Sequence, residues 1–259
     1  MATLVTVHAH PDDEAIACGG TIAKAAKEGH RVVIVFATRG EHGEVADGFL
    51  EPGEELAARR EIEARRAAEL LGAHRVEFLG YRDSGMMGTP ENDSPGSFWL
   101  AGVTEAAERL ARILQDESAD VVTIYDSNGT YGHPDHIQVY RVGARAAEIA
   151  GTKRVYESVA NRDRIQQLMS QLAETGVSPP IDPEAEGLGV PESIITTFVD
   201  VEEFAELKRA AMAAHASQIP ENSFFLSLPD ELHREVFGTE HYVLRGAPPG
   251  LRETDLFAD

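Results

Sequence analysis

The first 150 residues of the chain alternate between two kinds of hydrophobic pattern. Short β-branched runs, typical of buried strands, lie at residues 3–7, 31–37, 75–79 and 120–125. Segments with helical spacing lie at residues 15–27, 54–71, 103–115 and 134–150. Because each strand leads into a helix, the pattern predicts an α/β fold with a mostly parallel sheet and helices on both of its faces.

The pattern is less regular beyond residue 151. It predicts a strand at residues 153–159, a helix at 162–174, a loop at 178–191, a strand at 194–201 and a helix at 203–215. The last forty residues mix short helical and strand-like pieces up to Tyr242-Val243-Leu244. No long linker interrupts the chain, so we expect a single domain over residues 1–259, with a core at about 1–160 and a C-terminal cap at about 161–259.

Composition excludes several classes of protein. The 259 residues are 42% hydrophobic and 26% charged, which suits a globular protein that needs no metal for stability, so any metal would serve chemistry. The net charge of −21 argues against partners such as nucleic acid or anionic membranes. Cys18 is the sole cysteine, and we expect it to be a small buried residue. Without a signal peptide or a long apolar run, a cytoplasmic protein is expected, and a homo-oligomer is left open.

The triplet His-Pro-Asp occurs twice, once after the first predicted strand and once after the fourth. The two motifs are His10-Pro11-Asp12-Asp13-Glu14 and His133-Pro134-Asp135-His136. Composition alone predicts on the order of 0.03 chance occurrences of the triplet. Because open α/β sheets bind ligands at the carboxyl ends of their strands, we expect the two motifs to meet there. Two long polar loops, 38–53 and 80–95, follow other strands at the same edge.

Proline suits the first position of a helix, so we place Pro11 and Pro134 there. His133 then caps its helix and His136 lies in the first turn, whereas Asp12 and Asp13 diverge by about 100° around theirs. Two histidines and one carboxylate are typical of catalytic zinc sites. The candidate ligand set is accordingly His10, Asp13 and His136.

The remaining polar residues of the two motifs have catalytic interpretations. Asp12 is a candidate general base for a zinc-bound water. His133, kept protonated and oriented by Asp135, would stabilise an oxyanion or protonate a leaving amine. The alternative is that the aspartates merely begin helices and the histidines are hydrogen-bonded structural groups.

Other residues have simpler interpretations. Gly19-Gly20 is not a phosphate-binding loop and is expected to allow close helix packing. His215 is either a pocket contact or a cation at a helix C-terminus. Met86 and Met87 either gate a pocket or fill a gap, and we expect them to fill a gap. Phe98 and Trp99 either line a sugar site or belong to the core, and we expect the core.

The chain resembles the PIG-L/LmbE-like family of metal-dependent N-deacetylases. The resemblance rests on Ala-His-Pro-Asp-Asp-Glu at 9–14 and Tyr-Gly-His-Pro-Asp-His at 131–136. Weaker family features are Thr-Arg-Gly-Glu at 38–41, Arg60-x-x-Glu63, Tyr-Arg-Asp-Ser-Gly-Met at 81–86 and His-Ala-Ser-Gln at 215–218. The resemblance implies a Rossmann-like sheet and zinc held by His10, Asp13 and His136, although Fe²⁺ would suit the same ligands.

The resemblance also implies roles for individual residues. Asp12 would be the general base, and His133, supported by Asp135, would stabilise the tetrahedral intermediate with help from Tyr131. Arg60 and Asp83 would bind sugar hydroxyls, although a surface ion pair is an equal alternative for Arg60.

The expected function is zinc-dependent removal of an acetyl group from a small-molecule amino sugar of the N-acetylglucosamine type. The alternatives are a conjugate amidase that acts on a bulkier amide and a non-catalytic homologue that binds sugar or metal. A phosphoesterase is disfavoured because two-metal sites need more ligands than the two motifs supply.

Overall fold

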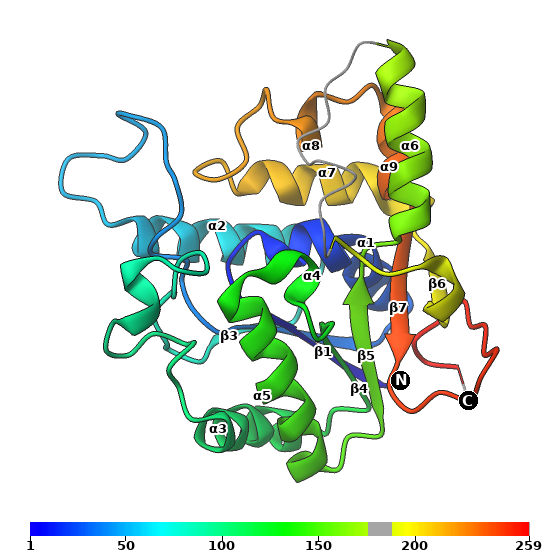
Figure 1. The fold of residues 1–259 in the computed structure, drawn as a ribbon, viewed down its shortest axis with the longest axis horizontal. Helices are drawn as coiled ribbons and strands as arrows, with labels where there is room; N and C mark the ends of the chain where they lie inside the picture. Colours follow the sequence, from blue (N-terminus) through cyan, green and yellow to red (C-terminus); the bar gives the residue numbers. More distant parts are fainter. Residues whose placement is uncertain (176–187, 259) are drawn as a thin grey trace.

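The computed structural model describes residues 1–175 and 188–258 of the chain (Figure 1). Its centre is a seven-stranded sheet in the order β3-β2-β1-β4-β5-β7-β6. The strands are β1 Thr3–His8, β2 Arg31–Phe36, β3 Arg75–Phe78, β4 Val121–Tyr125, β5 Arg154–Val159, β6 Thr197–Asp200 and β7 Thr239–Leu244. Strands β1 to β5 run parallel, as the alternating pattern predicts, whereas β7 is antiparallel to both β5 and β6.

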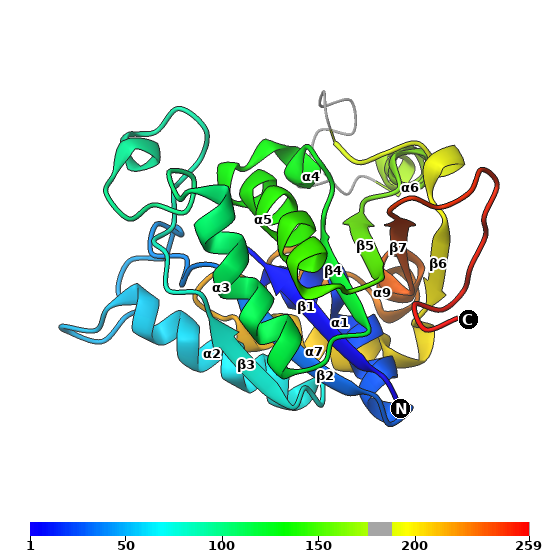
Figure 2. The ribbon, with the colours of Figure 1, turned by 90° about the horizontal axis from the view of Figure 1, so that it is seen from below.

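Helices cover both faces of the sheet (Figures 1 and 2). The longer ones are α1 Asp13–Lys27, α2 Leu56–Leu70, α3 Val103–Asp116, α5 Pro134–Ala150, α6 Arg162–Thr175, α7 Ala205–Ala214 and α9 Asp230–Phe237. Short turns of helix are η1 Pro90–Asp93, α4 Gly129–Gly132, η2 Glu192–Ile194, η3 Glu202–Phe204 and α8 Phe224–Ser227. Helices α3 and α5 lie on one face, and α1, α2 and α7 lie on the other. The sequence therefore predicts the α/β architecture correctly.

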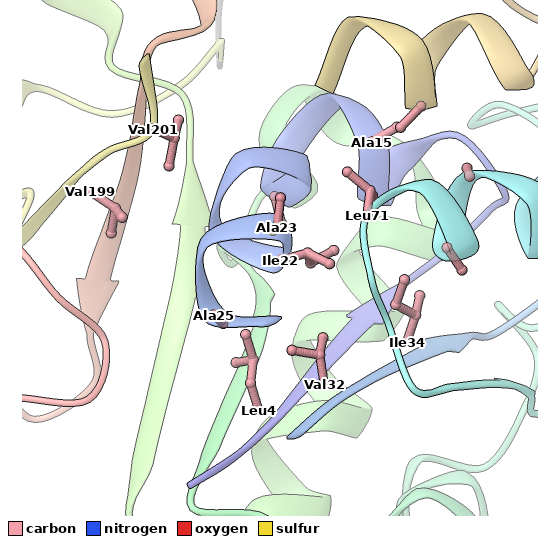
Figure 3. Close-up of a cluster of buried hydrophobic side chains, with 14 of the residues drawn as sticks. Leu4, Ala15, Ile22, Ala23, Ala25, Val32, Ile34, Leu71, Val199 and Val201 are labelled. Atoms are coloured by element: carbon pink, nitrogen blue, oxygen red, sulfur yellow. The ribbon is translucent and has the colours of Figure 1, made fainter. Parts of the chain in front are cut away.

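Each face of the sheet buries its own apolar cluster. Figure 3 shows the cluster beneath α1, where Ile22 lies near Leu4 and Val32 of the sheet and Leu71 closes the side toward α2. The opposite cluster joins valines of β1, β2 and β4 to Leu110 of α3 and to other side chains of α3 and α5. Burial on both faces explains why the central strands are continuous apolar runs rather than alternating ones.

Small residues on α1 permit close packing, as expected. A Cβ atom on Gly20 would lie 2.5 Å from the side chain of Val201. Cys18 is fully buried, and burial raises the pKa of its thiol to about 12. Phe98 belongs to the core, whereas Trp99 is half-buried and lies over the guanidinium of Arg141.

The C-terminal third extends the sheet rather than simply covering its edge. Strand β7 comes from the stretch whose structure the sequence leaves ambiguous, and it lies between β5 and β6. Helix α7 joins α1 and α2 in one layer. Most of the predicted loop at 178–191 lies outside the described residues. None of the helices in the described ranges is both long and apolar enough to cross a membrane.

Candidate active site

The two His-Pro-Asp motifs meet at one edge of the sheet, as predicted. Strands β1 and β4 are neighbours, with Leu4 paired to Val121, so their carboxyl ends lie side by side. The motifs follow these ends directly. The ring centres of His10 and His136 are 5.5 Å apart, and that of His133 is 4.6 Å from His10. All three imidazoles are buried.

The two helices begin differently. Helix α5 begins as predicted, with Pro134 in its first turn and His133 as N-cap, whose Nδ1 accepts the Asp135 N–H at 3.1 Å. The placement of Pro11 at the first position of α1 is wrong, because that helix begins at Asp13 and Asp12 is its N-cap. Asp12 has φ 117°, a value that non-glycine residues rarely adopt. The helix begins late because Pro11 and Asp12 form a turn. This turn brings Asp13 back toward His10, and the Asp13 carboxylate accepts the backbone N–H of His10 at 2.8 Å.

The Asp13 carboxylate lies between two of the histidines. Its Oδ2 is 3.6 Å from Nδ1 of His10, and its Oδ1 is 3.5 Å from Nε2 of His136. Nitrogens of His10, His133 and His136 also lie within 4.8 Å of one another. Imidazole and carboxylate groups at this spacing fit a divalent cation such as zinc. By distance alone the three histidines form one possible metal-binding group and His10, Asp83 and Asp135 form another, whereas Asp13 belongs to neither group and contacts His10 and His136 individually.

Carboxylates dominate the electrostatics of this cluster. Burial opposes a charge on His10, but hydrogen bonds to Asp135 and Asp83 outweigh it and raise its pKa well above the usual value. Burial alone would raise the pKa of Asp13, yet His136 and His10 lower it to about 2. A cluster that holds several carboxylates and favours positive charge on a histidine suits a bound cation.

Asp12 differs from its neighbour Asp13. Desolvation, together with the nearby Asp13 charge and against the effect of Arg60, raises its pKa to about 6. The guanidinium of Arg60 donates to Asp12 Oδ1 at 3.2 Å. A carboxylate that stays ionised near neutral pH but binds a proton readily is suited to general-base catalysis.

The hydrogen bonds of the Asp135 carboxylate go to His10 and Ser84 rather than to His133, so the proposed support of His133 by Asp135 is limited to its nearby charge and its backbone N–H. It accepts hydrogen bonds from Nε2 of His10 at 3.1 Å and from the backbone N–H of Ser84 at 2.9 Å, and also from the Ser84 hydroxyl. Burial, with His10 and His136 nearby, lowers the pKa of His133 to about 4, which favours the neutral form of its ring. The Asp135 side chain contacts His10 because the first turn of α5 directs it toward the end of β1.

The predicted oxyanion and sugar contacts surround the cluster. The Tyr131 hydroxyl lies 3.5 Å from Nε2 of His136, on a half-exposed ring. Arg60 is buried and donates to the carbonyls of Gly40 and Pro11 as well as to Asp12, so the surface ion-pair alternative is wrong. Asp83 is also buried, and its Oδ1 lies 3.5 Å from Nε2 of His10.

Several residues near the cluster escaped assignment from sequence. Ser84 contacts Asp135, and Glu14 joins the backbone of Asp12 to His215. His215 ends α7, as the helix C-terminal alternative expects, and its Nε2 contacts the buried carboxylate of Glu14. Ser84 and His215 lie in motifs of the family resemblance, but their partners are far away in sequence. The expectation that Met86-Met87 fill a gap is wrong: both side chains are about half exposed, on the loop that follows β3.

Known proteins match this chain over its full length. Residues 5–147 match the family described as PIG-L: GlcNAc-PI de-N-acetylase. The chain is 40% identical to a 1D-myo-inositol 2-acetamido-2-deoxy-alpha-D-glucopyranoside deacetylase of Geodermatophilus obscurus, over 98% of this chain and 97% of that protein. A protein of the same name from Acidothermus cellulolyticus is 40% identical, over 100% of this chain and 95% of its own length.

A solved structure shares the arrangement as well. The N,N'-diacetylchitobiose deacetylase of Pyrococcus horikoshii has a TM-score of 0.61 and 26% sequence identity, over 96% of this chain and 84% of that one. The two His-Pro-Asp motifs, the parallel sheet and the named relatives all indicate the same family. The chain therefore belongs to the PIG-L family of metal-dependent N-deacetylases.

Proposed function

We propose that this chain removes the acetyl group from an N-acetylglucosamine unit joined to a small polyol, with zinc as the working metal. The observation that carries the proposal is the placement of Asp13 between His10 and His136 with a second carboxylate, Asp12, beside it. Fe²⁺ would suit the same donors and is the alternative metal.

The cation would be held by His10, Asp13 and His136. His10 follows β1, His136 follows β4, and the Asp13 carboxylate lies between the two rings. When bound, the cation would polarise the acetyl carbonyl and lower the pKa of a water molecule. Asp135, through its contact with Nε2 of His10, would fix the orientation of that ring.

Asp12 would accept the proton of the attacking water and later return it to the departing amine. Its pKa of about 6 lets one carboxyl group serve both steps, as base first and as acid second. Arg60 would hold this carboxylate in place through the 3.2 Å contact to Oδ1. An acid–base group that is positioned and tuned in this way contributes about 10²–10⁴-fold to a rate.

His133 would donate a hydrogen bond to the developing oxyanion while remaining neutral. Because its Nδ1 accepts the Asp135 N–H, the proton of the neutral ring lies on Nε2. The Tyr131 hydroxyl lies 3.5 Å from Nε2 of His136, and burial raises the pKa of that hydroxyl, so it stays protonated. Two neutral donors can stabilise negative charge without competing as acids.

The substrate class follows from the relatives, whose names specify an acetamido sugar attached to myo-inositol. We propose the same class here, as a small-molecule substrate met in the cytoplasm. Loop 38–53 borders the cluster because the carbonyl of Gly40 accepts a hydrogen bond from Arg60, and loop 80–99 borders it because Ser84 contacts Asp135. These two loops are the segments that would contact the sugar and its polyol.

The test is acetate release by zinc-loaded protein from an N-acetylglucosaminyl-inositol and from a panel of other N-acyl amino sugars. We expect activity that a chelator abolishes and Zn²⁺ restores, with Asp12→Asn retaining zinc but losing most turnover, and His136→Ala losing zinc. Normal turnover in Asp12→Asn would refute the assignment of the base. Release of larger acyl groups in preference to acetate would favour a conjugate amidase, and no release at all would indicate a binding protein.

A further inference from the structure

Glu14 is a buried carboxylate with two different partners. Its Oε2 accepts the backbone N–H of Asp12 at 2.9 Å, and its Oε1 lies 2.6 Å from Nε2 of His215. The side chains of Glu14 and His215 are both fully buried. The contact joins residues 201 apart in sequence, one in the first turn of α1 and one at the end of α7.

The backbone of Asp12 requires support of this kind. Its φ of 117° and ψ of −32° lie outside the regions that residues with a side chain favour. Such a conformation is strained and persists where the surroundings hold it. The hydrogen bond to Glu14 acts on the amide of Asp12, whereas Arg60 contacts its carboxylate. Two separate contacts therefore hold this residue, one at the backbone and one at the side chain.

Glu14 can serve as this acceptor because His215 is its partner. A carboxylate removed from water is unfavourable unless a charged or hydrogen-bonding partner compensates it. His215 supplies that partner from the C-terminal third of the chain. Without it, Glu14 would turn toward water or bind a proton, and the amide of Asp12 would lose its acceptor or face a weaker one.

We propose that His215 is a positioning residue for the catalytic base, acting through Glu14 on the backbone of Asp12. The proposal rests on the proposed function of Asp12. In this arrangement the last turn of α7 completes an active site whose other members come from the first 136 residues. The side chain of His215 is fully buried and its hydrogen bond goes to Glu14 rather than to a proposed metal ligand, so its removal should alter turnover more than substrate or metal binding.

The same helix offers a matched control. About two turns before His215, Lys208 contacts Oε1 of Glu240 at 2.6 Å, and both residues are buried. Glu240 also accepts backbone N–H groups of α1, from Gly20 and Thr21, at 2.8 Å each. Each pair thus joins a nitrogen group of the α7 segment to a buried carboxylate that accepts backbone N–H groups, but Glu240 holds the amides of Gly20 and Thr21 and not that of Asp12.

The experiment compares His215→Phe with Lys208→Met, each at a temperature well below its own Tm. We expect His215→Phe to lower kcat roughly 10–100-fold, the scale of a small misplacement of a catalytic group, with KM and zinc affinity within about twofold of the parent protein. Lys208→Met should lower Tm but leave kcat within about twofold, because buried ion pairs that are broken destabilise the fold.

A double-mutant cycle tests whether His215 acts through Asp12. In an Asp12→Asn background, adding His215→Phe should cost little further turnover, because the group that it positions is already absent. Additive losses would overturn the proposal, and so would a loss of turnover no larger than that of Lys208→Met. Where His215→Phe does not fold, His215→Gln and His215→Asn replace it. The Gln amide reaches the position of Nε2 and should preserve kcat, and the shorter Asn should not.

A crystal structure of the variant gives a readout that does not depend on activity. We expect Asp12 in His215→Phe to leave the φ 117° conformation and Asp12 in His215→Gln to keep it. An unchanged Asp12 backbone in His215→Phe would overturn the positioning role even if the protein deacetylates. Absence of acetate release by the parent protein would instead refute the proposed function and leave the structural result valid.

Discussion

Replacing Asp135 by asparagine tests whether this residue acts on the metal ligand His10 or on His133. Its carboxylate accepts three hydrogen bonds, one from Nε2 of His10 at 3.1 Å and two from Ser84. An asparagine offers one acceptor oxygen for these three donors, and its amide group would face one of them as a donor. The hydrogen bond from His10 therefore loses its charged acceptor, whereas the capping of α5 by His133 uses the backbone of residue 135 and is retained.

The size of the effect follows from the contact that is lost. A hydrogen bond to a charged group contributes about 1.5–3 kcal/mol. Since about 1.4 kcal/mol corresponds to a factor of ten, zinc affinity should fall about 10–100-fold, which is also the usual cost of removing a carboxylate behind a histidine ligand.

The assay is competition between the metal-free protein and a chelator of known zinc affinity. Asp83→Asn is the control. The Asp83 carboxylate lies farther from Nε2 of His10, at 3.5 Å, so this substitution should lower zinc affinity less. The reasoning fails if Asp135→Asn binds zinc as tightly as the parent protein while losing turnover. That result would mean that Asp135 acts through His133, as the sequence alone suggested.

Three further predictions concern other parts of the molecule. Arg60→Lys keeps the charge but cannot span Asp12, Pro11 O and Gly40 O at once, so kcat should fall at least about tenfold at unchanged zinc content, measured by acetate release and metal analysis. His233 is buried, with no hydrogen-bond partner for either ring nitrogen among the described residues; burial, Arg209 and Lys208 lower its pKa to about 4. Its neutral form is thus favoured on folding, and about 3 kcal/mol of stability should be lost as pH falls from 6.5 to 4. Urea unfolding of His233→Leu should show a weaker loss, and an equal pH dependence would contradict the interpretation. The Cys18 thiol, with its pKa raised to about 12, should resist iodoacetamide until the protein is unfolded, as mass spectrometry would show.

Local pattern was sufficient for the architecture and for the place of the site. The alternation of apolar runs and helical segments predicts the first four of the five parallel strands, whereas the fifth is expected only as a strand in the less regular region. It also brings the two His-Pro-Asp motifs together, since carboxyl ends of parallel strands share one edge. Strand β7 was not predicted, because its position between β5 and β6 depends on pairing across the chain rather than on its own residues.

The sequence by itself determined which residues gather at the edge of the sheet, and the tertiary structure decided which of them touch. Asp135 contacts His10, 125 residues away, rather than its neighbour His133, and His215 reaches Glu14 across 201 residues. Helix α1 begins at Asp13 rather than at Pro11, and the contacts of Glu14 and Arg60 hold Asp12 as its N-cap. The physical reason is that composition and spacing fix the path of the backbone, whereas the direction of a side chain depends on packing against segments that are distant in sequence.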